Sequence, residues 1–212
     1  MNTHRSDLRL SIVAFSLALG LSAPAAWANP EVWRRSYALE AQGDTRGALA
    51  ALDTLPADAQ RQYLCALRRG WLLYQAGRFD ESVAAYQLAA NASRGAIEPR
   101  VGELLPLLAL RRWQDAETLA REVLRMDDDN YLASRRLALA LYNLGRFDQA
   151  RGVYQSVLTR YPGDLEMLTG VGWCELRRGR RGEAAEAFRA VLAVSPDDAN
   201  AAAGLAATNE RH

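Results

Sequence analysis

The stretch Gly145-Arg146-Phe147-Asp148-Gln149-Ala150 lies between two runs of apolar residues and recurs along the chain. The related phrases at 77–82, 111–116 and 179–184 are displaced from it by 34 residues or by a multiple of 34. The same step back from residue 77 reaches the phrase at 43–48. A fixed period of this length is the sequence signature of a repeat architecture, in which each unit packs only against its neighbours. The register holds without an insertion and predicts five units, at 29–62, 63–96, 97–130, 131–164 and 165–198.

Each unit carries the pattern of two helices. In the fourth unit Leu137 and Leu141 precede the glycine, and Val153 and Val157 follow it at helical spacing. Glycine suits the turn between two helices because it adopts positive φ without steric cost. Alanine, leucine and arginine dominate the chain, and half of its residues are hydrophobic, which is a helix-forming composition. We therefore expect an all-α chain built from helix hairpins.

Two further positions of the unit predict how its helices pack. The residue five places after the central turn residue is small in every unit, which allows two helices to approach closely; these residues are Ala48, Ser82, Ala116, Ala150 and Ala184. Four places later comes a residue that fills the core in four units of the five: Leu52, Tyr86, Tyr154 and Phe188, with Ala120 as the exception. Pro162 and Pro196 close the last two units, where proline no longer damages the second helix.

The repeat length, the central glycine, the small residues at positions eight and twenty, the aromatic at twenty-four and the proline at thirty-two resemble the tetratricopeptide repeat. The resemblance covers 29–198 and implies a right-handed superhelical solenoid of five hairpins that binds a partner without catalysing a reaction. A terminal repeat leaves an apolar face uncovered, so we expect a capping helix and a tail over 199–212. The third unit departs from the pattern, because Arg111 replaces the central glycine and Pro106 should kink or shorten the first helix.

The first 28 residues have the three parts of a secretory signal peptide. A polar segment with Arg5 and Arg9 precedes an apolar run at 10–21, and the segment ends in the small-x-small pattern Ala26-Trp27-Ala28. As a helix the apolar run would span roughly 18 Å, short of a bilayer core of about 30 Å. We expect cleavage after Ala28, and the use of arginine without lysine points to a GC-rich bacterial genome, so the expected destination is the periplasm. An uncleaved membrane anchor is the alternative.

Charge and residue content argue against several classes of function. The chain has 26 basic and 25 acidic residues, and loss of residues 1–28 removes two arginines and one aspartate, which leaves a formally neutral protein. A neutral chain lacks the basic footprint of a nucleic-acid partner. Beyond the signal segment the sole histidine is His212, so no triad has a base and no Cys/His cluster has metal-ligand spacing. We expect no enzymatic activity, small-molecule substrate, cofactor or metal.

The two cysteines fall in different units, Cys65 in the second and Cys174 in the fifth. Packed helices lie about 8–10 Å apart, so hairpins three units apart should be separated by roughly 30 Å. A disulfide requires Cα atoms within about 7 Å. We therefore expect two separate buried thiols.

The resemblance implies that the first helix of each hairpin lines a concave groove, through positions that spacings of three and four place on one stripe. Carried over to this chain, the candidate partner-binding residues are Trp33, Tyr37, Trp71, Tyr74, Arg135, Tyr142, Asn143, Trp173 and Arg177. Tryptophan is not typical of the family at the position of Trp71 and Trp173, so we expect these two to be exposed anchors. Packing against the neighbouring hairpin is the alternative role. The remaining tryptophan of the mature chain, Trp113, falls at a core position.

These features predict a periplasmic adaptor whose groove holds an extended or helical peptide. The resemblance implies partners from envelope machines, such as polysaccharide-export, pilus or outer-membrane assembly components. Two alternatives remain open: a carbohydrate-binding module that stacks sugars on Trp71 and Trp173, and a membrane-tethered assembly factor. The sequence carries no signal for one partner or for an oligomeric state.

Overall fold

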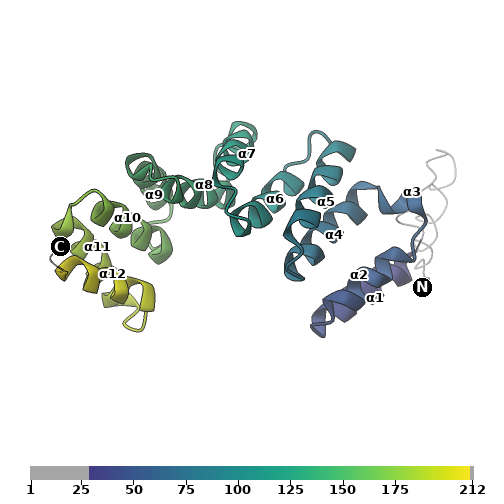
Figure 1. The fold of residues 1–212 in the computed structure, drawn as a ribbon, viewed down its shortest axis with the longest axis horizontal. Helices are drawn as coiled ribbons and strands as arrows, with labels where there is room; N and C mark the ends of the chain where they lie inside the picture. The colour runs from purple at the N-terminus through teal and green to yellow at the C-terminus, as the bar shows by residue number, and fades with distance from the viewer. Residues whose placement is uncertain (1–28, 211–212) are drawn as a thin grey trace, which may run out of the picture.

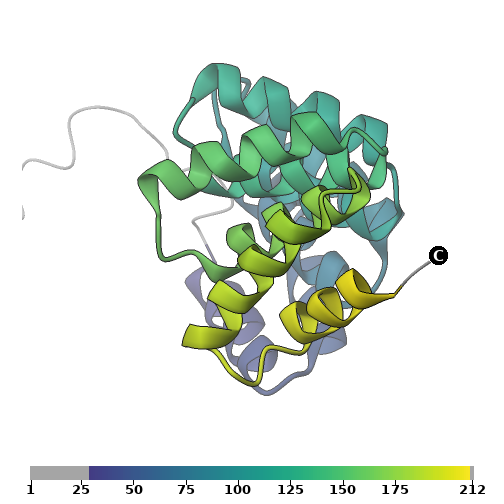
Figure 2. The same cartoon turned by 90° about the vertical axis from the view of Figure 1, so that its left-hand side faces the viewer.

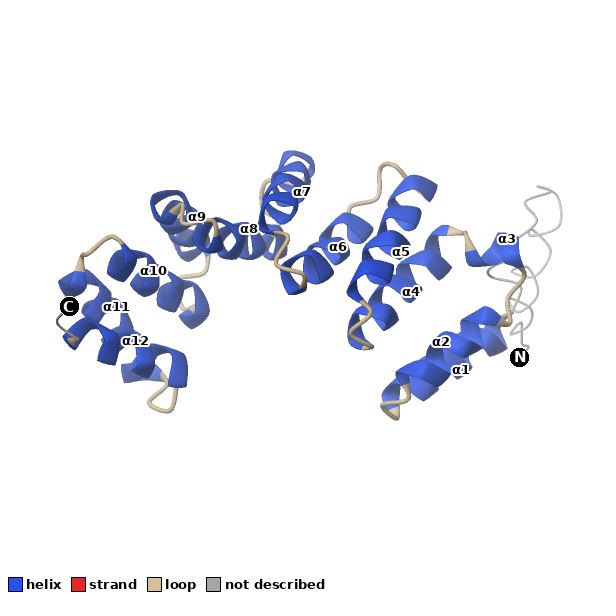
Figure 3. Ribbon diagram, in the orientation of Figure 1, coloured by secondary structure: helices blue, strands red, loops and turns tan. Residues whose placement is uncertain are grey.

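The computed structural model describes residues 29–210, which form helices joined by short turns and contain no strand (Figure 3). The predicted signal segment, 1–28, lies outside the described residues. In chain order the helices are α1 (Pro30–Ala41), α2 (Thr45–Asp53), α3 (Ala57–Gln60), α4 (Tyr63–Gln75), α5 (Phe79–Ala92), α6 (Glu98–Ala109), α7 (Trp113–Met126), α8 (Tyr131–Asn143), α9 (Phe147–Arg160), α10 (Leu165–Arg177), α11 (Arg181–Val194) and α12 (Ala199–Asn209). The prediction of an all-α fold is confirmed. Within these residues no helix is long and apolar enough to cross a membrane.

The repeat period fixes where the helices begin. The second helices α5, α7, α9 and α11 each contain 14 residues and start 34 residues apart. Before each of them the chain turns through a residue with positive φ, as the glycine pattern predicts. Gly77, Gly145 and Gly179 have φ angles of 73°, 75° and 78°, and Arg111 adopts the same region at 57°.

The hairpins stack side by side into a curved solenoid, with α1 and α12 at opposite ends of its long axis (Figure 1). Each second helix packs against the first helix of the next hairpin. Seen from the C-terminal end, α12 lies beside α11 (Figure 2). This is the predicted capping helix, and its buried Ala201 and Gly204 cover the end of the stack.

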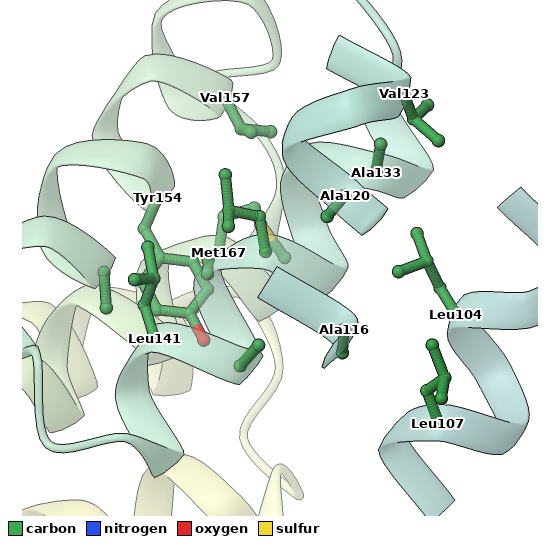
Figure 4. Packing of buried hydrophobic residues seen from close by; sticks show 14 of the residues in the cluster. Leu104, Leu107, Ala116, Ala120, Val123, Ala133, Leu141, Tyr154, Val157 and Met167 are labelled. Carbon is green, nitrogen blue, oxygen red and sulfur yellow. The ribbon is translucent and has the colours of Figure 1, made fainter. Parts of the chain in front are cut away.

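The small residues predicted at the helix crossings are all fully buried, as are the residues predicted to fill the core, with at most 7% of any exposed. Figure 4 shows part of this core, with Leu104 and Leu107 of α6 facing Ala116 and Ala120 of α7. The large rings pack directly on glycine. A Cβ atom on Gly170 would lie 2.6 Å from Tyr154, and one on Gly204 would lie 2.3 Å from Phe188. Backbone approach therefore depends on the absence of a side chain at these positions.

These contacts form a regular set of three residues, spaced 16 apart, at each junction between hairpins. We call each set a packing triad, and its middle member is the residue that fills the core. A large aromatic is flanked by glycine or alanine, whereas a smaller middle residue has larger flanks. The five triads are Ser36/Leu52/Arg68, Gly70/Tyr86/Gly102, Leu104/Ala120/Arg136, Ala138/Tyr154/Gly170 and Gly172/Phe188/Gly204.

Two parts of the chain depart from the regular pattern. The second helix of the first hairpin, α2, has 9 residues, and the short helix α3 follows it after Pro56. In α6 the helix runs through Pro106 to Ala109, so the expectation that proline shortens it is wrong for its C-terminal end. There Leu110 N–H still donates to the Pro106 carbonyl at 2.9 Å.

Candidate functional site

The inner side of the solenoid holds a cavity of about 730 Å³. We call it the groove cavity. Its walls come chiefly from the first helices of successive hairpins, α4, α6, α8 and α10, together with α12. The lining residues are Tyr74, Leu105, Leu108, Ala109, Arg135, Arg136, Leu139, Tyr142, Asn143, Tyr154, Glu166, Gly170, Trp173 and Asn200. Segments from residue 74 to residue 200 therefore meet at one hollow.

Five of the nine residues predicted for the groove line this cavity: Tyr74, Arg135, Tyr142, Asn143 and Trp173. Arg177 lies next to it, since its Nε donates to the Tyr142 hydroxyl at 3.2 Å. The other three predicted residues, Trp33, Tyr37 and Trp71, belong to the first two hairpins and do not line the cavity. The predicted stripe is thus divided into a C-terminal cavity and an N-terminal surface.

The N-terminal surface is an aromatic shelf made of Tyr37, Trp71 and Tyr74. Trp71 is 37% exposed, and its ring centroid lies 5.9 Å from that of Tyr74, which in turn lines the cavity. The Trp71 indole N–H donates to Glu40 Oε1 at 2.6 Å, so the ring is held in one orientation. Although burial opposes its ionisation, hydrogen bonds from Trp71 and Arg68 hold the pKa of the Glu40 carboxyl below its ordinary value. The ring is therefore preorganised for contact.

Trp173, at the other end of the site, is more firmly built into the fold. Its ring packs edge-on against Phe188, with 5.3 Å between centroids, and its indole N–H donates to Asn200 Oδ1 at 2.9 Å. Trp173 is only partly buried and lines the cavity, so it serves packing and surface together. Trp113, for which the sequence predicted a core position, is also only partly buried, because it lies at the first residue of α7.

The charged side chains of the cavity differ in their partners. Arg135 Nε donates to Glu166 Oε1 at 2.7 Å and forms an exposed ion pair. Arg136, the next residue, reaches between α8 and α6 and donates to the Val101 carbonyl. The sequence analysis missed Arg136 because this position is not on the family stripe. The signal that could have found it is the small Ala120, which leaves room for a long side chain in the same packing triad.

Both cysteines are buried and neither forms a disulfide, as predicted. Burial raises the pKa of the Cys65 thiol, and burial raises that of Cys174 to about 12. A thiol with a raised pKa is a poor nucleophile, because the thiolate is the reactive form. In the part of the chain that the structure describes, no group of three or more His, Cys, Asp or Glu residues could hold a metal ion.

Comparison with known protein families gives one match, to the tetratricopeptide repeat, over residues 34–97, 106–164 and 172–212. These segments cover most of the chain. A curated relative, the protein CTR9 homolog of Arabidopsis thaliana, is 31% identical over 129 residues. That alignment covers 60% of this chain and 12% of the relative, so the chain corresponds to a small part of a much longer protein.

Several solved structures share the fold. A tetratricopeptide repeat protein from Parabacteroides merdae superposes with a TM-score of 0.77 at 18% identity, covering 86% of this chain and 72% of the other. The protein MamA gives 0.70 at 17% identity, with 79% and 92% covered. YrrB, described as a repeat protein with an unusual peptide-binding site, gives 0.67 at 17% identity, with 79% and 87% covered. At these identities the likeness establishes the fold alone.

Proposed function

Because the chain belongs to the tetratricopeptide repeat family, whose members are in general non-enzymatic scaffolds for protein–protein interaction, we propose that its groove cavity binds a peptide segment of a partner protein. The observation that carries this proposal is the cavity itself, whose walls combine exposed apolar side chains with a few polar groups. Its volume falls within the range of about 300–1,000 Å³ typical of ligand sites. The description of YrrB as peptide-binding supports the same class of ligand here.

The exposed groove residues suit an extended or helical segment better than a compact ligand. Leu139 is 42% exposed on the cavity wall, and the aromatic shelf continues the same surface toward the first hairpin. Rigid aromatic rings and aliphatic side chains provide contact area at low entropy cost, which is why they dominate binding energy. A peptide lying along the groove would contact the shelf and the cavity in succession.

The matching experiment is an array of 12-residue peptides probed with the purified protein and with single variants. Truncation of a central anchor typically costs about 2 kcal/mol or more, which is roughly thirtyfold in affinity. Trp71→Ala and Leu139→Ala should therefore weaken the bound peptides by about that factor while the helix content stays unchanged. Tyr161→Ala is the control, because Tyr161 is 47% exposed, also packs on another tyrosine and does not line the cavity.

Equal losses in all three variants would contradict a groove site. A parallel panel of soluble oligosaccharides addresses the carbohydrate alternative, since tryptophan rings also stack on sugars. Binding of sugars in the absence of any peptide ligand would replace the present proposal with that alternative.

For the cellular setting we propose the bacterial periplasm, with a component of a polysaccharide-export, pilus or outer-membrane assembly machine as partner. The support is the signal-peptide pattern of residues 1–28 and the start of α1 at Pro30, two residues after the expected cleavage site. Mass spectrometry of periplasmic protein should identify Asn29 as the first residue. Full-length protein in the membrane fraction would favour a tethered factor instead.

A further inference from the structure

Arg136 occupies a place that glycine occupies at three other junctions. The equivalent residues Gly102, Gly170 and Gly204 each touch a large ring, which fills the space between hairpins. At the junction of α7 and α8 the middle residue of the packing triad is Ala120, which is fully buried and has no ring. A long side chain can therefore enter there, and Arg136 places a guanidinium at the wall of the groove cavity.

This guanidinium has no anionic partner within the described chain. Its one hydrogen bond goes to the carbonyl of Val101, and no carboxylate among residues 29–210 lies within ion-pair distance of it. A guanidinium carries five N–H donors, so most of its donor capacity is unused. Burial lowers the pKa of Arg136, and the neighbouring cation of Arg135 lowers it further.

Arg68 offers an internal comparison, because it holds the same place in the first packing triad. Its guanidinium donates to the carboxylate of Glu40 and to the Ser36 carbonyl at 3.2 Å, and the ring of Tyr37 covers it at 3.8 Å. Arg68 is thus fully engaged within the protein, whereas Arg136 is partly buried in a cavity and lacks the carboxylate. A partly buried cation is stabilised strongly by a paired anion.

We propose that the groove cavity receives the side-chain carboxylate of an aspartate or glutamate from an internal segment of the partner, and that Arg136 pairs with it. This proposal rests on the proposed peptide-binding function and names the chemistry of its ligand. Arg177, exposed beside the cavity and bonded only to the Tyr142 hydroxyl, adds a second positive charge. The anion comes from within a segment, because groove residues lie on both sides of Arg136, with Tyr74 toward one end and Trp173 toward the other.

The test uses an array of N-acetylated peptides joined to the support through their C-termini, so that no terminal carboxylate is present. Peptides that bind the full-length protein should contain aspartate or glutamate, and replacement of that residue by asparagine or glutamine should weaken binding about tenfold or more. Since the protein itself is unaltered in this comparison, the result does not depend on the folding of a variant.

The protein variants are Arg136→Met and Arg135→Met. Both remove one positive charge from α8, but Arg135 is already paired with Glu166 at the cavity rim. Methionine keeps much of the packing volume of the arginine stem, which thermal melts would verify. We expect Arg136→Met to lose the preference for acidic over amide peptides, and Arg135→Met to retain most of it.

The outcomes separate this inference from the broader one. Peptides that bind in the groove with no acidic preference, or with a preference that survives Arg136→Met, would overturn the role of Arg136 and leave the peptide-binding function standing. Binding only by a companion set with free C-termini would overturn the internal-segment form. Absence of any peptide ligand would remove both proposals.

Discussion

Arg111 holds a backbone conformation that the other hairpin turns give to glycine. Its φ of 57° lies in the left-handed region, where a side chain costs roughly 1–2 kcal/mol. Glycine avoids that cost but loses about 0.5–1 kcal/mol more in unfolded-chain entropy. We therefore expect Arg111→Gly to raise the free energy of unfolding by about 0.5–1 kcal/mol, measured by urea denaturation. Gly145→Arg, at the equivalent turn with φ of 75°, should lower it by about the same amount, and a gain there would refute the explanation.

Glu103 is a buried carboxylate without an arginine partner. Only the Gln87 amide donates to it, at 2.8 Å, while Arg100 and Arg112 act from a greater distance and Glu122 opposes them. Burial raises its pKa above the ordinary value of 4.5, against the lowering effect of Gln87. A raised folded-state pKa means that the stability gained on protonation is present at low pH and is lost as the pH rises through that pKa. Glu103→Gln should therefore stabilise the protein near neutral pH.

Thermal melts as a function of pH check this expectation. The gain from Glu103→Gln should shrink as the pH falls toward about 4.5, where the wild-type side chain is itself neutral. Glu117→Gln is the contrast, because the Glu117 carboxylate accepts from Arg146 at 2.7 Å and from Arg121 at 3.1 Å. Its loss should destabilise at neutral pH. A destabilising Glu103→Gln would mean that the carboxylate is paired in solution.

At the scale of the helices, the packing triads explain how irregular residues fit into a regular stack. Ala120→Tyr should be destabilising by about 1–3 kcal/mol, since Leu104 and Arg136 already occupy the space beside it. The triple change Leu104→Ala, Ala120→Tyr and Arg136→Gly reproduces the set Ala138/Tyr154/Gly170 found one hairpin later. It should recover most of the lost stability, as a coupling free energy measured against the single variants. Additive losses would show that the triads are not packing units.

The helices themselves were largely predictable from sequence, because period, turn glycine and small residue act within one hairpin. The groove was less so. The family stripe placed Tyr74, Tyr142 and Trp173 correctly on the cavity wall, since helical spacing alone decides which residues share a face. Arg136 escaped because its side chain enters the wall only where a different hairpin supplies Ala120. Similarly, Trp113 is less buried than predicted, since its place at the first residue of α7 leaves it at the edge of the stack.

Across the whole molecule the junctions are unequal. The first is the weakest, since α2 ends after 9 residues and its packing on α4 is sparser than the packing at any later junction. Its centre is a polar contact, in which Arg68, 7% exposed, bonds to Ser36 and Glu40 of α1. In a repeat array each hairpin is stabilised only by its neighbours, so stability can differ along the chain. The aromatic shelf, which spans this junction, is therefore the part of the groove most open to local unfolding.

Native-state hydrogen exchange makes this inequality measurable. Amides of α1 and α2 should open at a lower free energy than those of α8 to α11, where large rings fill the triads. Arg68→Met should release the first hairpin further, because breaking a buried pair costs about 3–5 kcal/mol and leaves Glu40 with the Trp71 indole. Arg69→Met is the matched control, since its pair with Asp53 is more exposed and surface pairs contribute about 1 kcal/mol or less. Protection in α8 to α11 should stay unchanged in both variants, because these helices do not contact the first hairpin. Equal exchange along the whole chain would show instead that the array unfolds as one cooperative unit, and that the first junction is as strong as the rest.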